Sequence, residues 1–70
     1  MLRDLTAAEK LTLESLVDAA SLQGVLVALA EIAGEKAEHI ATNWQDTRLA
    51  KDWANAANAI ERAVPKALNL

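Results

Sequence analysis

The sequence contains no cysteine, phenylalanine or tyrosine, and its 70 residues include one proline, two glycines and two tryptophans. Without cysteine, neither a disulfide framework nor a thiolate metal site can support so small a domain, so its stability must come from packing. The longest apolar run, Val25 to Ala30, is too short to cross a bilayer. Because the N-terminus also lacks a basic region followed by an apolar core, we expect a cytoplasmic protein with no membrane partner.

Signature motifs of catalysis and cofactor binding are also missing from the sequence. It contains no Walker loop, dinucleotide fingerprint, zinc-ligand spacing, EF-hand loop or nucleophile motif. We therefore predict that the protein is not an enzyme and carries no cofactor. The net charge of −3 argues against nucleic acid as a general partner, since phosphate binding requires a concentrated positive field.

The most apolar and most periodic segment extends from Ser21 to Trp44 and predicts one long helix near residues 22–43. Its apolar residues recur at steps of three and four, which places them on one face of the helix. They are Leu22, Leu26, Leu29, Ala33, Ala37, Ile40 and Trp44. In the first three turns Val25 and Ile32 widen this face on one side and Val27 lies on the other, so this end is apolar nearly all round.

A shorter helix is predicted before this segment, near residues 7–20. Thr6 and Glu9 have the spacing of a capping box, although Thr12 offers a competing start. Ser21 is a suitable N-cap for the long helix that follows. The alternative is a single unbroken helix that bends near Ser21.

A third helix is predicted near residues 47–64, after the N-cap Asp46 and before Pro65, which disfavours helical geometry in the residue preceding it. Its inward stripe alternates steps of four and three, the spacing of antiparallel helix packing. The stripe consists of Leu49, Trp53, Ala56, Ile60 and Ala63.

A ridge of small residues on the long helix would allow another backbone to come close. It consists of Ala30, Gly34, Ala37 and Ala41.

These signals predict a single all-α domain over residues 1–70, in which a short N-terminal helix lies across the wider end of a long antiparallel helical hairpin. Residues 1–5 and 65–70 are expected to be loose termini. Folding should bury about 6,600 Å², which stabilises by roughly 100 kcal/mol if about 60% of it is apolar. Because ordering the chain costs roughly 105 kcal/mol, a monomer is marginal, and we expect assembly into a dimeric bundle.

The apolar edge of the long helix is the predicted dimer interface, because the other two helices can cover only part of a helix that is apolar nearly all round. On this edge Val25, Ile32 and His39 recur every seven residues, with Leu29 and Lys36 beside them. A two-fold interface is self-complementary, so Val25 and Ile32 should meet their own copies or one another. The protein would then be a non-catalytic interaction or regulatory module that binds a second copy of itself or another protein.

Four side chains on the long helix form the one cluster that resembles a metal site: Glu31, Glu35, Glu38 and His39. A di-iron helical bundle requires Glu and His three residues apart on the same helix, and this pair is missing. We therefore predict no metal site. His39 is interpreted as a surface imidazole or as a contact across the symmetric interface.

The two tryptophans suggest a first alternative function. Trp44 and Trp53 both belong to inward stripes at one end of the hairpin, where they would pack in the core. They would equally suit the lining of a small-ligand pocket between helices, as in a ligand carrier.

A basic face on the third helix suggests a second alternative, weak nucleic-acid binding. Arg48, Asn55 and Arg62 recur every seven residues with Lys51 beside them, and Arg and Asn are side chains that read base edges. The competing interpretation is a solvated face whose arginines pair with acids from the first two helices. The long second helix and the turn without glycine are untypical of a helix-turn-helix motif, which favours the solvated face.

Overall fold

The computed structural model describes residues 3–70 and shows an all-α chain of three helices, as predicted, with no strand in that range. The first helix, α1, spans Ala7–Ala20, the second, α2, spans Leu22–His39, and the third, α3, spans Thr47–Ala63. A π-helical segment, η1 (Ile40–Trp44), extends α2, and a 3-10 segment, η2 (Val64–Ala67), follows α3. Met1 and Leu2, part of the predicted loose N-terminus, lie outside the described residues.

Local capping explains where each helix begins. Thr6 and Glu9 form the predicted capping box, in which the Thr6 hydroxyl accepts from Glu9 N at 3.1 Å and the Glu9 carboxylate accepts from Thr6 N at 2.9 Å. Ser21 caps α2 by accepting from Gly24 N at 3.0 Å, and Asp46 caps α3 by accepting from Leu49 N at 3.0 Å. These bonds satisfy amides that have no partner inside a helix. Thr12, the competing start, lies inside α1.

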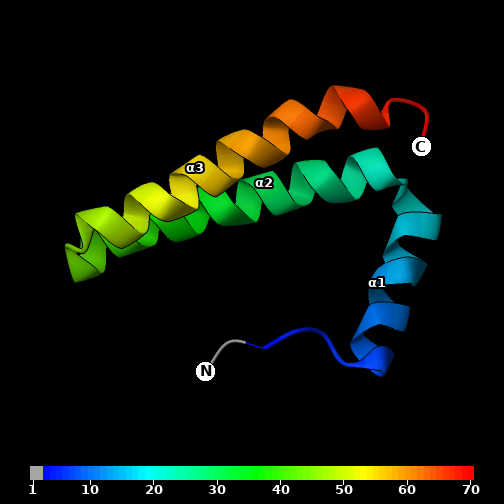
Figure 1. The fold of residues 1–70 in the computed structure, drawn as a ribbon, viewed down its shortest axis with the longest axis horizontal. Helices are drawn as coiled ribbons and strands as arrows, with labels where there is room; N and C mark the ends of the chain where they lie inside the picture. The colour runs from blue at the N-terminus through cyan, green and yellow to red at the C-terminus, as the bar shows by residue number, and fades with distance from the viewer. Residues whose placement is uncertain (1–2) are drawn as a thin grey trace.

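The helices form a hairpin with one arm. Figure 1 shows α2 and α3 running antiparallel, while α1 leaves the start of α2 on the opposite side from α3. The chain bends by 115° between α1 and the helix from Leu22 to Trp44. Within the described residues, the backbone of α1 comes close to α2 and not to α3. Residues 3–20, hereafter the arm, therefore depend on α2 alone.

Alanine forms the contact between α2 and α3. The side chains of Ala30 and Ala33 on α2 and of Ala50 and Ala57 on α3 expose no more than 7% of their surface. We call these four residues the alanine seam. Small side chains let two helix axes approach closely, so the predicted ridge of small residues is realised at Ala30, although Ala41 at its far end is exposed.

The inward stripe predicted for α3 is wrong at two positions. Leu49 is 43% exposed and Ala56 is also exposed, whereas the next residue in each case, Ala50 or Ala57, is buried. Close approach of the two backbones leaves room for a methyl group at the centre of the contact but not for a leucine. The larger side chains, including Trp53 and Ile60, are only half-buried and flank the seam.

Trp44 is also misplaced by the sequence prediction, since its side chain is 73% exposed rather than inward-facing. The reason lies in η1, where hydrogen bonds run from residue i+5 rather than i+4 to residue i and each residue turns the chain by less than in an α-helix. Over five residues this lag rotates Trp44 away from the stripe of α2. Gln45 then adopts a left-handed conformation, with φ 53°, and reverses the chain.

The C-terminal segment, predicted as a loose tail, is tied to the hairpin at several points. Val64–Ala67 form η2, and Ala67 is 3% exposed. Leu22 N donates to the Leu70 carbonyl at 3.0 Å, which brings the C-terminus beside the junction of α1 and α2 (Figure 1). The predicted effect of Pro65 on Val64 is wrong: Val64 keeps helical angles, with φ −54° and ψ −48°, and the chain continues from α3 into η2, which contains Pro65.

Candidate interaction surface

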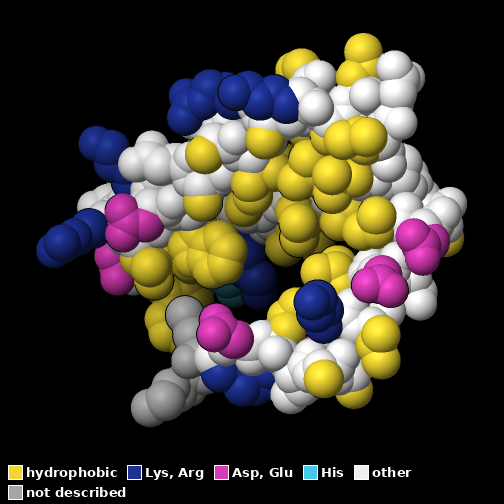
Figure 2. Space-filling view, turned by 45° about the vertical axis from the view of Figure 1, so that its right-hand side comes forward, with side chains coloured by type: hydrophobic (Ala, Val, Ile, Leu, Met, Phe, Trp, Pro, Cys, Tyr) yellow, Lys and Arg dark blue, Asp and Glu magenta, His cyan; other side chains and the backbone are white. Residues whose placement is uncertain are grey.

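Large apolar side chains are exposed over much of the molecule. No large side chain of residues 3–70 is fully buried, and Figure 2 shows hydrophobic side chains gathered around a hollow on one face. The exposed set comprises Leu5, Leu11, Leu16, Val27, Leu29, Ile32, Trp44, Leu49, Leu68 and Leu70. Isolated exposed leucines are ordinary on protein surfaces, but a contiguous apolar area of this kind is typical of an interaction site.

Four of the predicted interface residues, Val25, Ile32, Lys36 and His39, lie on a flank of α2 turned from the alanine seam, and Leu29 borders the seam one turn before Ala33. Ile32 is 48% exposed, Leu29 is 40% exposed and Val25 is half-buried. Lys36 and His39 are exposed and line a shallow depression with Ile32. The edge thus changes from apolar to charged along α2, in the order that the sequence predicts.

His39 makes local contacts only. The Asn43 amide nitrogen lies 3.0 Å from His39 Nδ1 and donates to the His39 carbonyl at 3.1 Å, one helical turn away. Within the described part of the chain, no group of three or more His, Asp or Glu side chains lies close enough together to hold a metal ion.

The basic residues of α3 are exposed and unpaired. Arg48, Lys51, Asn55 and Arg62 all face solvent. The single ion pair found among residues 3–70 is that of Arg3 with Glu9, so the predicted pairing of the α3 arginines with acids of the first two helices does not occur. Arg48 instead lines a shallow depression together with Asp52, and the Asp52 carboxylate offsets part of the positive charge of this face.

The two tryptophans do not meet the requirement of a shared ligand pocket. Trp44 is largely exposed, Trp53 is half-buried, and neither lines the most pronounced surface depressions of residues 3–70. An open, polar depression of about 650 Å³ lies between the end of α1 and the C-terminal Leu70.

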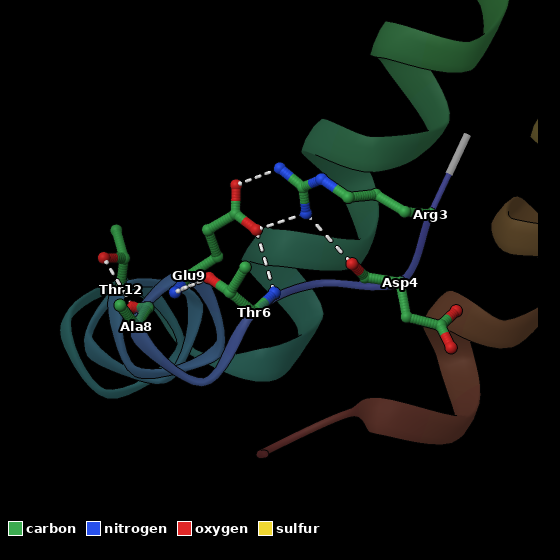
Figure 3. A network of polar contacts seen from close by, with 6 residues as sticks. All are labelled: Arg3, Asp4, Thr6, Ala8, Glu9 and Thr12. Atoms are coloured by element: carbon green, nitrogen blue, oxygen red, sulfur yellow. Dashed lines mark hydrogen bonds and ion pairs between the residues drawn. The ribbon is translucent and has the colours of Figure 1, made fainter. Parts of the chain in front are cut away.

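The start of the arm is organised by a small polar network (Figure 3). Arg3 Nη1 and Nη2 donate to the two Glu9 carboxylate oxygens at 2.6 and 3.0 Å, and Thr6 N donates to the same carboxylate. The Arg3 guanidinium, followed by the hydrogen bonds from Thr6, lowers the pKa of Glu9 from 4.5 to about 2. These groups are solvent-exposed, so the network orders the first turn of α1 without forming a closed site.

The arm contributes apolar surface that the sequence analysis missed. Leu11 and Leu16 of α1 and Leu5 before it are each more than half exposed. The pattern of α1 contained a signal for this, because Leu11 lies off the stripe formed by Leu13 and Val17. A helix with apolar residues on two sides needs two partners, and α2 supplies only one of them.

No protein-family model matches the chain, and no curated protein or solved structure is significantly similar to it. Among residues 3–70, no single helix has both the length and the apolar character needed to cross a membrane; α1 and the Leu22–Trp44 helix pass that test only when counted together across their bend.

Proposed function

We propose that the protein is a small non-catalytic oligomerising module of the cytoplasm, most simply a homodimer, that acts in scaffolding or regulation. Its partner face is the apolar edge of α2, carried by Val25, Leu29 and Ile32 and bordered by Lys36 and His39. The support comes from the surface that the folded chain leaves uncovered.

The accessible surface area carries this proposal. A folded monomer of 7.5 kDa is expected to expose about 4,250 Å², whereas this chain exposes 5706 Å². The excess of about 1,450 Å² is roughly a fifth of the area that folding should bury. A stable interface removes about 800 Å² from each partner, and obligate homodimers remove more. A second copy can therefore restore the missing burial.

The shape of the chain accounts for the excess. Its principal extents are 37 × 28 × 14 Å, so the chain is flattened. The radius of gyration is 13.7 Å, compared with about 11 Å for a compact domain of this length. Domains are normally built from two packed layers, and this chain supplies one. The second layer is proposed to be another copy.

Light scattering on the native chain and on two matched variants tests the proposal. Ile32→Glu places a charge on the proposed face. Val27→Glu is the control, because Val27 is also β-branched and exposed on α2 but lies about 140° around the helix from Ile32. The native chain and Val27→Glu are expected to have the mass of a dimer at micromolar concentration, and Ile32→Glu that of a monomer.

Two results would contradict the proposal. A native chain that is monomeric at high micromolar concentration would show that the apolar edge needs no partner. A dimer that survives Ile32→Glu but is lost in Val27→Glu would show that the partner face lies on the other side of α2.

A further inference from the structure

The junction between α1 and α2 is a single strained residue. Ser21 has φ 89° and ψ 155°, a backbone region that is populated almost only by glycine because a side chain collides there with the backbone. Non-glycine residues persist in such a conformation when the surrounding structure holds them. Here the surroundings are two hydrogen bonds, from Gly24 N to Ser21 Oγ and from Leu22 N to the Leu70 carbonyl.

Apart from the Ser21 cap, the local sequence favours a continuous helix at this point. Ala19, Ala20, Leu22 and Gln23 are good helix formers, and no proline interrupts them. The helical hydrogen bonds on both sides of the junction are already present, from Ser21 N to the Val17 carbonyl at 2.8 Å and from Val25 N to the Ser21 carbonyl at 3.1 Å. Rotation of the backbone near one residue would join α1 and α2 into a continuous helix.

The apolar pattern continues through the junction in helical register. Leu13, Val17, Ala20 and Gly24 follow one another at steps of four, three and four. This is the seam of a helix that packs lengthwise on another helix. In the bent chain the seam is divided between two helices that point in different directions, whereas in a continuous helix it forms one stripe.

The contact between α1 and α2 can be made equally well between two chains. The arm rests on α2 alone, so a partner's arm can replace it without disturbing α3. Exchange of an identical element keeps the contacts of the single chain and relieves the strained junction. A second copy can also cover part of the excess accessible surface.

We propose, building on the homodimer above, that the two copies exchange their arms. In this dimer Ser21 is helical, α1 and α2 form one continuous helix, and α1 of each copy packs on α2 of its partner. The surface involved is the start of α2 beside the junction, beyond which α1 of the single chain turns away (Figure 1), and the occupant is the arm of a second copy.

Distances between spin labels test the exchange, and the absence of native cysteine allows specific labelling at Lys10→Cys and Glu38→Cys, two exposed positions. In the bent chain the two sites lie about 24 Å apart, as follows from the 115° bend and the helical rise. In a continuous helix they lie about 42 Å apart. A doubly labelled chain diluted with unlabelled chain reports the distance within one chain, and mixed singly labelled chains report the distance between chains.

The exchanged dimer is expected to give about 42 Å within a chain and about 24 Å between chains. Ser21→Ala should increase the population with the long distance within a chain, because alanine favours the helix and disfavours positive φ. Ser21→Gly should increase the population with the short distance, because glycine adopts positive φ without strain.

Mass and distance together separate the two proposals. A dimer with the short distance within each chain and no response to Ser21→Ala would overturn the exchange and leave the homodimer intact. A monomer would overturn both. A dimer with the long distance within a chain but no short distance between chains would show straight helices without exchanged arms, and would also overturn the exchange.

Discussion

The α2–α3 hairpin buries four alanines between two antiparallel helices, whereas α1 buries no residue and is attached through one strained serine. In the hairpin, small side chains fix the separation of the helices. In the arm, capping hydrogen bonds and an exposed ion pair fix the start and end of a helix that has little packing. The comparison shows that close approach and large burial are different properties, because alanine permits the first and contributes little to the second.

The largest effect is expected from enlarging the alanine seam. Ala57→Leu inserts three carbon atoms where two backbones meet and should destabilise the hairpin by about 1–3 kcal/mol. Ala59→Leu makes the same change on an exposed part of α3 and should change the stability by less than about 0.5 kcal/mol. Urea denaturation followed by circular dichroism measures both. Equal effects of the two variants would mean that the seam is not closely packed.

Removing one helix cap in the hairpin and one in the arm distinguishes the two regions further. Asp46→Ala and Thr6→Ala each delete a side-chain acceptor, a loss that typically costs about 1 kcal/mol. The Asp46 variant should lower the global free energy of unfolding, since α3 is part of the hairpin. The Thr6 variant should mainly accelerate hydrogen exchange within α1. A global loss of similar size from Thr6→Ala would show that the arm unfolds together with the hairpin.

The two glycines of α2 should respond differently to substitution. A Cβ atom added at Gly34 meets no atom within 4 Å, so the chain itself does not require glycine there. Gly34→Ala should therefore stabilise the hairpin by about 0.5–1 kcal/mol through helix propensity. At Gly24, beside the arm, the added Cβ would lie 3.3 Å from Ser21 Oγ and press on the cap, so Gly24→Ala should gain less. Thermal unfolding of the two variants measures the difference.

The smallest effect is expected from acidification, and it should appear in the arm. Because folding lowers the pKa of Glu9 from 4.5 to about 2, its stabilising contribution is complete above pH 4.5 and is lost as the pH falls toward 2. The groups are solvent-exposed and screened, so the change should be visible mainly as fraying of the first turn of α1. Amide chemical shifts of residues 7–10 measure it, and Glu9→Gln should remove the pH dependence while hairpin shifts stay constant.

The sequence by itself determined three helical segments and their candidate N-caps, but it left two choices open: Thr6 or Thr12 as the start of α1, and two helices or one bent helix around Ser21. Thr6, Ser21 and Asp46 each satisfy amides within three residues, so their roles follow from local hydrogen bonding and need no knowledge of the rest of the chain. The apolar periods likewise give three helices and an antiparallel hairpin. The exposure of Ile32 on the outer edge of α2 also followed from counting how many sides of a helix one chain can cover, whereas Leu29, which the apolar period also places on the inward stripe, is 40% exposed.

Only the tertiary structure decided which residues lie at the contacts. Ala50 and Ala57 replace Leu49 and Ala56 at the centre of the hairpin, because the distance between the helix axes, which a single period does not specify, determines the size of side chain that fits. Trp44 turns outward because η1 changes the angle per residue, and the tail is held because Leu70 meets Leu22 across the fold. These three outcomes depend on contacts between segments distant in sequence or on a small departure from ideal helix geometry. A local sequence pattern encodes neither the distant contacts nor the departure.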